Sequence, residues 1–342
     1  MAELEVATKA PESDALEDTT AAATTETSQT SPAVDTPPTP MGDHCTRDRP
    51  TPTGQASTGE ITKLGGVDVY ISKPSDYPHT PSRFLLLLTG GTGLLSVNNQ
   101  IQADNFAAEG YVVVMPDLFE GEPAPNSSSN PSQEEQSSGS SLLDAFKTKA
   151  AEAAKSFLID MWLARHTAAK VMPLLHKVLD ASKDEFADAV SNGGGVYAVG
   201  YCFGARYILL LAAERSAAQQ QQGGRLPWAK EEQRDVEAGK PAMLGPYIKA
   251  GALAHPTLVS RDDFVGLKAP VSIVAVESDP LFPDEVRTAG EDYMTKNNVE
   301  HEVQVYPGVP HGFAVVGDYD DAQIKSAQET AFDQMLKWIQ EH

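Results

Sequence analysis

Hydrophobic positions follow two different spacings from about residue 65 onward, and each spacing predicts a kind of element. Short, continuous or alternating apolar runs are typical of strands. Between them, apolar residues recur about once per turn, which is typical of helices that bury one face. Strands are predicted at 67–72, 84–88, 111–115, 195–199, 247–254, 271–276 and 302–306. Helices are predicted at 98–109, from 142 onward, through 171–178, after 204, and at 284–296 and 322–339.

The alternation of these strands and helices predicts an α/β fold. Its central sheet is expected to be mostly parallel, with helices on both faces. The run at 67–72 alternates apolar and polar residues, so we expect it at an edge of the sheet. The strand at 84–88 is continuously apolar, which favours a central position.

Long polar stretches divide the chain into a tail and one domain. Residues 1–60 are poor in large apolar side chains and rich in Thr, Ser, Ala, Pro and acids, which predicts a disordered acidic tail. The domain is expected at 61–342. Polar insertions near 121–141 and 219–240 are predicted to be surface loops of this domain.

Composition excludes several classes of partner. The formal net charge of −22 argues against binding to nucleic acid or to an anionic membrane surface. The first residues are acidic, with no apolar signal segment, and no apolar run approaches the length of a membrane span. The two cysteines, one in the tail and one in the domain, favour a reducing, cytoplasmic compartment.

The chain contains a candidate nucleophile elbow around Cys202. A Val-rich strand leads into Gly200-Tyr201-Cys202-Phe203-Gly204, and an apolar helix follows. Small residues two positions before and after the nucleophile let strand and helix approach closely, as in the G-x-S-x-G turn of α/β-hydrolases. The alternative is a buried structural cysteine in an ordinary strand-to-helix turn.

Two further residues complete a candidate triad. Asp279 follows the strand at 271–276, and His311 follows the strand at 302–306. Nucleophile, acid and histidine occur in the chain order of α/β-hydrolases, and the carboxyl ends of parallel strands meet at one edge. His311 would take the proton of Cys202, and Asp279 would orient His311. Glu277 is the alternative acid, but Asp279 is favoured because it lies in the turn.

Other residues are candidates for the pocket around the triad. Backbone N–H groups of Phe203 and of the Gly90-Gly91 loop are expected to form an oxyanion hole, although that loop is equally compatible with a plain glycine turn. The candidates for substrate contacts are Arg206, His255 and Phe313. Arg206 has two equal alternatives, a substrate carboxylate or a neighbouring loop, and His255 is also compatible with a structural role. No metal site is predicted from the His and Cys spacing.

The sequence resembles the dienelactone hydrolase family, the cysteine branch of the α/β-hydrolases. The resemblance rests on the elbow, on Gly110-Tyr111 and Pro116-Asp117-Leu118, on the 277–280 turn and on His311-Gly312-Phe313, and it covers residue 60 to the C-terminus. Ala254-His255-Pro256 and the long tail are similar to fungal-type members. The resemblance implies a single α/β/α domain that hydrolyses esters without a cofactor, with Cys202, Asp279 and His311 as the triad.

One departure from the family pattern affects the expected chemistry. The family's prototype has a glutamate after the strand equivalent to 84–88, where this chain has Thr89-Gly90-Gly91-Thr92. Cys202 is then expected either to rest as an ion pair with His311 or to be activated in a different way. The prototype's carboxylate-binding arginines have no clear counterpart beyond Arg206, so dienelactone itself is not implied as the substrate.

The function expected from these features is hydrolysis of a small ester, lactone or thioester through an acyl-Cys202 intermediate. The main alternative is a non-catalytic binding protein that keeps the fold, which the missing glutamate and the polar insertions favour. An acyl transferase or isomerase on the same triad would differ only in what intercepts the intermediate. The expected partner is a small ester or lactone, no cofactor is expected, and the sequence does not determine the oligomeric state.

Overall fold

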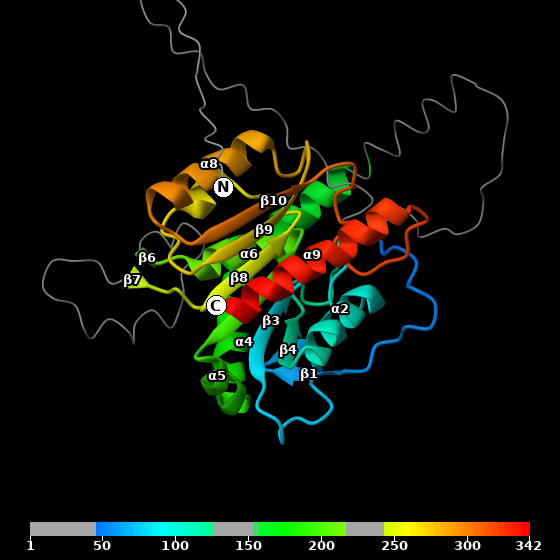
Figure 1. Cartoon of the computed structure of the whole chain (residues 1–342), viewed down its shortest axis with the longest axis vertical. Helices are drawn as coiled ribbons and strands as arrows, with labels where there is room; N and C mark the ends of the chain where they lie inside the picture. The colour runs from blue at the N-terminus through cyan, green and yellow to red at the C-terminus, as the bar shows by residue number, and fades with distance from the viewer. Residues whose placement is uncertain (1–45, 126–153, 155, 217–242) are drawn as a thin grey trace, which may run out of the picture. The chain divides into compact units, whose positions relative to one another are not determined.

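A mixed eight-stranded sheet forms the centre of the molecule (Figure 1). The computed structural model describes residues 46–125, 154, 156–216 and 243–342; most of the predicted tail and of both polar insertions lies outside this part. The strands, in their order across the sheet, are β1 (Glu60–Leu64), β2 (Val67–Ser72), β4 (Tyr111–Pro116), β3 (Arg83–Leu88), β5 (Val196–Tyr201), β8 (Ala250–Ala254), β9 (Val271–Val276) and β10 (His301–Tyr306).

Helices cover both faces of this sheet. One face packs against α2 (Val97–Ala108) and α9 (Ala322–Glu341), and the other against α4 (Ala168–Glu185), α6 (Phe203–Ala212) and α8 (Asp284–Lys296). Figure 1 shows α9 running across β8 and β9. The apolar run of β3 is continuous because its two sides face two cores: Phe84 and Leu86 pack into one, and Leu85 and Leu87 into the other. The predicted α/β fold, with a mostly parallel sheet, is confirmed.

The edge of the sheet differs from the prediction. Residues 67–72 do form β2, but β1 pairs with it and takes the edge, so β2 lies between β1 and β4. Gly65 and Gly66 make the two-residue hairpin turn with φ angles of 59° and 81°. A Gly-Gly pair between two strands is a strong hairpin signal. The strand before it was missed because its side chains are mostly exposed and polar.

Smaller elements connect these layers. They are α5 (Ala187–Gly193), the single-turn η2 (Arg261–Phe264), and a separate two-stranded antiparallel sheet of β6 (Arg215–Ser216) and β7 (Met243–Leu244). The predicted helix from residue 142 is described as helical at 156–165. Within the described ranges, no helix combines the length and the apolar character needed to cross a bilayer.

Residues 46–59, which the composition assigned to the tail, pack against this domain. Asp48 accepts a hydrogen bond from Ser96 at 2.8 Å, and Thr51 donates one to Asn98 at 2.8 Å. The backbone N–H of Thr58 donates to the carboxylate of Asp104 at 2.7 Å. These contacts are polar, which explains how a segment with so few apolar residues is held.

Candidate active site

The chain turns sharply between β5 and α6, with Cys202 at the apex. Cys202 has φ 50° and ψ −112°, a conformation that costs free energy for any residue except glycine. A Cβ at Gly200 would lie 2.6 Å from Ile208, and one at Gly204 would collide with the carbonyl oxygen of Leu88. Only glycine fits at these two positions, so the spacing of the elbow motif has a direct steric cause.

Asp279 and His311 meet at the same edge of the sheet. His311 Nδ1 lies 2.6 Å from Asp279 Oδ2, and the two side chains are 8% and 0% exposed. The Nδ1–H group donates to the carboxylate. The other ring nitrogen, Nε2, is left to interact on the side of Cys202. Asp279 also accepts a hydrogen bond from the backbone N–H of Leu281 at 2.9 Å. Glu277, the alternative acid, is exposed, and its backbone N–H bonds to Tyr306.

A threonine hydroxyl that the sequence did not single out lies between the thiol and the imidazole. Thr257 Oγ1 is 3.2 Å from Cys202 Sγ and 3.2 Å from His311 Nε2. Thr257 follows the end of β8, as Cys202 follows β5 and His311 follows β10. Its position just after a parallel strand is the one signal by which sequence reasoning could have found it.

The surroundings of His311 favour its charged form. Burial lowers the pKa of the imidazole, but hydrogen bonds with Asp279 and Cys202, together with their charges, outweigh burial and raise the pKa to about 9. A histidine with this pKa holds a proton at neutral pH. The site is therefore suited to an imidazolium beside a thiolate.

Cys202 and His255 line a small cavity of about 30 Å³, which has room for one or two water molecules. Gly90 is part of this wall, and a Cβ there would lie 3.1 Å from the Cβ of Cys202. Another part of the lining, residues 47–49, comes from a segment that the sequence did not connect with the site. The other lining residues are Arg47, Asp48, Arg49, Gly91, Thr92, Asn98, Asn99, Gly312, Val315, Val316 and Tyr319.

The predicted pocket residues lie at different positions relative to this cavity. Phe203 begins α6, where backbone N–H groups have no acceptor within the helix, and Gly91 lines the cavity beside Gly90. The ring of His255 lies 5.0 Å from that of His311, in an edge-on arrangement. Phe313 is fully buried and packs against His255 with ring centroids 6.2 Å apart.

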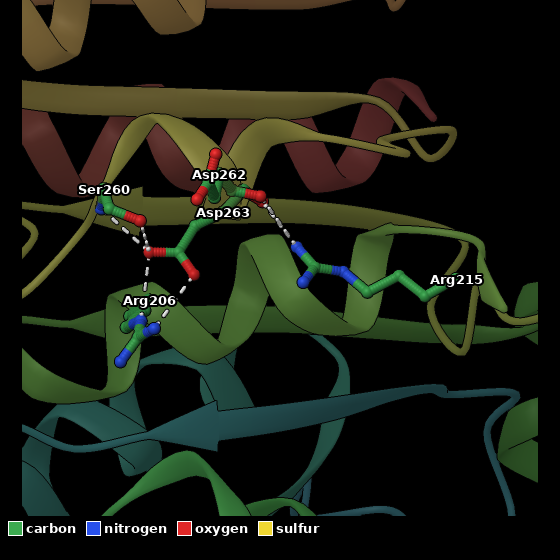
Figure 2. Close-up of polar contacts among 5 residues, drawn as sticks. All are labelled: Arg206, Arg215, Ser260, Asp262 and Asp263. Carbon is green, nitrogen blue, oxygen red and sulfur yellow. Dashed lines mark hydrogen bonds and ion pairs between the residues drawn. The ribbon is translucent and has the colours of Figure 1, made fainter. Parts of the chain in front are cut away.

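Arg206 faces a neighbouring loop. Its guanidinium makes two parallel hydrogen bonds to Asp263, at 3.1 Å and 3.0 Å (Figure 2). The same carboxylate accepts hydrogen bonds from the backbone N–H and hydroxyl of Ser260, and Arg215 donates to the carbonyl oxygen of Asp263. Of the two alternatives for Arg206, this geometry favours the loop, because a bidentate pair with a buried carboxylate occupies the guanidinium.

Known proteins from other organisms are similar to this chain over most of its length. Hydrolase pyvD of Aspergillus violaceofuscus is 28% identical over 284 residues, which is 83% of this chain and 90% of that protein. Dienlactone hydrolase 1 of Gibberella moniliformis is 28% identical over 283 residues, which is 82% of this chain and 87% of the relative. Both relatives are fungal.

Solved structures show the same fold. A putative dienelactone hydrolase from Klebsiella pneumoniae has a TM-score of 0.55 at 17% identity, and the match covers 84% of this chain and 100% of that one. Esterase 2 of Thermogutta terrifontis, phosphoramylated by tabun, has a TM-score of 0.53 at 16% identity. The match covers 84% of this chain and 96% of that one. Residues 67–342 match the Dienelactone hydrolase family, so the chain belongs to this family and is an ester hydrolase.

Proposed function

We propose that this ester hydrolase acts on a small ester, lactone or thioester through an acyl-Cys202 intermediate. The observation that carries the proposal is the continuous hydrogen-bonded series from the Cys202 thiol, through the Thr257 hydroxyl, to His311 and Asp279. A structural cysteine in an ordinary turn has no need of a buried imidazole held by a buried carboxylate.

In the first half of the reaction, Cys202 Sγ attacks the carbonyl carbon of the substrate. In the resting ion pair its proton is already on His311 Nε2, and Asp279 stabilises the imidazolium through Nδ1–H. The carbonyl oxygen becomes an oxyanion, for which the backbone N–H groups of Phe203 and Gly91 are the proposed donors. The intermediate collapses, the alkoxide leaves with the proton from Nε2, and a thioester to Cys202 remains.

In the second half, His311 Nε2 acts as the base for water. Water attacks the thioester carbon, a second tetrahedral oxyanion forms, and its collapse releases the acid and the Cys202 thiolate. His311 keeps the proton taken from water, so the resting ion pair is restored. If another nucleophile replaced water, the same site would perform acyl transfer.

The small cavity limits which substrates fit the site as described. A volume of about 30 Å³ is far below the ~300–1,000 Å³ of pockets that enclose a drug-sized ligand. Arg47 and Arg49 line this cavity together with Cys202, on a segment held by hydrogen bonds. We expect this segment to shift when substrate enters.

The test is turnover of aryl esters, lactones and thioesters by the parent protein and by Cys202→Ala and His311→Ala. We expect both variants to lose at least ~10³-fold in kcat/KM on every substrate that the parent hydrolyses. Cys45→Ala and His301→Ala are matched controls, because Cys45 lies in the predicted tail and His301 starts β10, at the opposite end of that strand from His311. Mass spectrometry of the acid-quenched protein should find the acyl group on Cys202. Full activity of Cys202→Ala would refute the mechanism.

A further inference from the structure

Thr257 contacts both reacting partners of the proposed triad, although the reaction described above makes no use of it. Its hydroxyl is 3.2 Å from Cys202 Sγ and 3.2 Å from His311 Nε2, and the residue is 1% exposed. A hydroxyl at this place is well separated from bulk water. Its hydrogen bonds therefore act directly on the charges of the thiol and imidazole.

One hydroxyl can serve the site in both of its protonation states. A hydroxyl carries one proton and two lone pairs. When the proton is on sulfur, Thr257 accepts from the S–H group and donates to Nε2. After that proton moves to the imidazole, Thr257 donates to the thiolate and accepts from Nε2–H. The second arrangement is the stronger one, because hydrogen bonds to charged partners are stronger than neutral ones.

The backbone holds Thr257 at this distance from the thiol. The N–H group of Thr257 donates to the carbonyl oxygen of Cys202 at 3.2 Å, so the loop after β8 is joined to the elbow itself. His255 and Leu258, on either side, have φ angles of 37° and 62°, which bend the loop tightly. The position of Thr257 is thus fixed by the chain and does not depend on its side chain alone.

The Arg206–Asp263 pair fixes the other end of this loop. Asp263 binds Ser260 in the loop and Arg206 in the elbow helix α6 at the same time (Figure 2). Since Cys202 and Arg206 belong to one turn-and-helix unit, the loop that carries Thr257 is attached to that unit on both sides. Arg206 therefore acts on the thiol through the loop.

We propose that Thr257 is a positioning residue, which holds Cys202 Sγ toward His311 and stabilises the thiolate by donating its hydroxyl proton. This inference rests on the proposed role of Cys202 as nucleophile. It also accounts for thiol activation where the loop after β3 has glycines and threonines and no acid.

Several titratable or charged groups surround the thiol and must stay unchanged in a test. His311 and Asp279 come from the loops after β10 and β9, and His255 from the loop after β8. Arg47, Asp48 and Arg49 also line the cavity. Substitution of Thr257 by valine removes the hydroxyl, keeps nearly the same volume and leaves all of these groups in place.

The experiment measures the rate at which iodoacetamide alkylates Cys202, as a function of pH. It compares the parent protein, Thr257→Val, Thr257→Ser and His311→Ala, each with Cys45→Ala so that one thiol reacts. We expect Thr257→Val to move the midpoint of the profile upward by about one pH unit, which makes alkylation about tenfold slower at pH values below the parent's midpoint. Thr257→Ser should restore the parent profile, because it restores the hydroxyl.

The outcomes separate this inference from the proposed function. If Thr257→Val has the parent profile while His311→Ala does not, Thr257 has no positioning role and the ion pair stands. If the parent and His311→Ala share the profile of an ordinary thiol, with a midpoint near ~8.5, then the activated nucleophile and this inference both fail. Thermal melting checks that each variant folds, and Thr257→Ala replaces Thr257→Val should the valine protein not fold.

Discussion

The two walls of the cavity are built by different physical means. On one wall, Cys202 and Gly90 lie on short turns at strand ends, and the backbone at Cys202 is forced into an unusual conformation by close packing. On the other wall, Arg47 and Arg49 belong to a segment that is held on α2 by side-chain hydrogen bonds. The first wall is part of the core, and the second is attached to it.

Because of this difference, we expect the first wall to govern the reaction and the second to govern the entry of substrate. A turn embedded in packed strands and helices cannot move without disturbing many contacts. A hydrogen bond between polar groups contributes only ~0.5–1.5 kcal/mol to stability. Substitutions in the first wall should therefore remove activity or unfold the protein, whereas substitutions in the second should change how readily substrate enters.

The largest effect is expected for Asp279→Asn. Asparagine keeps the shape of the side chain but cannot hold the Nδ1–H tautomer of His311 or stabilise its positive charge, so kcat should fall by ~10⁴-fold, as in other triads. Glu277→Gln is the matched control, because Glu277 is an exposed acid two residues away. A similar loss in both variants would show that the acid has been misassigned.

The elbow should also be sensitive to a single methyl group. Gly204→Ala places a Cβ against the carbonyl oxygen of Leu88, with no flexible side chain to give way, so we expect a loss of ~3 kcal/mol or more in the free energy of unfolding. Gly308→Ala is the control, since a Cβ there would meet only Gln323 Nε2, at 3.5 Å. Its cost should be ~1–2 kcal/mol, from its positive φ alone.

The pH dependence of the charge on His311 provides a test of the proposed triad. Its pKa of about 9 means that the protonated form stabilises the fold below pH ~6.5 and that this contribution is lost as the pH rises through 9. NMR titration of His311 should give a midpoint near 9 in the parent protein. Cys202→Ala removes a hydrogen bond and a charge that raise the pKa, so its midpoint should be lower; an equal or higher midpoint would contradict the ion pair.

The smallest effect is expected for the attached wall. Asn98 donates to the carbonyl oxygen of Arg49 at 2.7 Å and accepts from Thr51 at 2.8 Å, so Asn98→Ala should loosen residues 46–59. Loss of ~1 kcal/mol locally makes amide hydrogen exchange in this segment about fivefold faster. We expect KM to change while kcat is nearly constant. Asn192→Ala, which removes an amide bonded to Ser82, should leave exchange in 46–59 unaltered.

The sequence predicted the central fold because its pattern and its packing have the same cause. Residues 271–276 are apolar except for Ser272 since β9 is buried on both faces, and 284–296 begin and end where α8 does. The hairpin of β1 and β2 was missed because the exposed, polar residues of β1 have no distinctive pattern. Gly65-Gly66 was the available signal.

The candidate site was predictable only in part. Cys202, Asp279 and His311 lie in marked turns after strands, so their chain order made them candidates, and the structure brings their side chains together through Thr257. Thr257 is a common residue type, and only the contact across the loop distinguishes it. Arg206 had two equal alternatives because its partner, Asp263, lies far along the chain and was unknown without coordinates.

Residues 47–49 lie before residue 67, where the match to the family begins. The part of the chain that matches the family model therefore contains Cys202 and His255 but leaves out these three residues of the cavity's lining. A change of sequence at residues 47–49 would alter the lining of the cavity without changing any residue of the proposed triad.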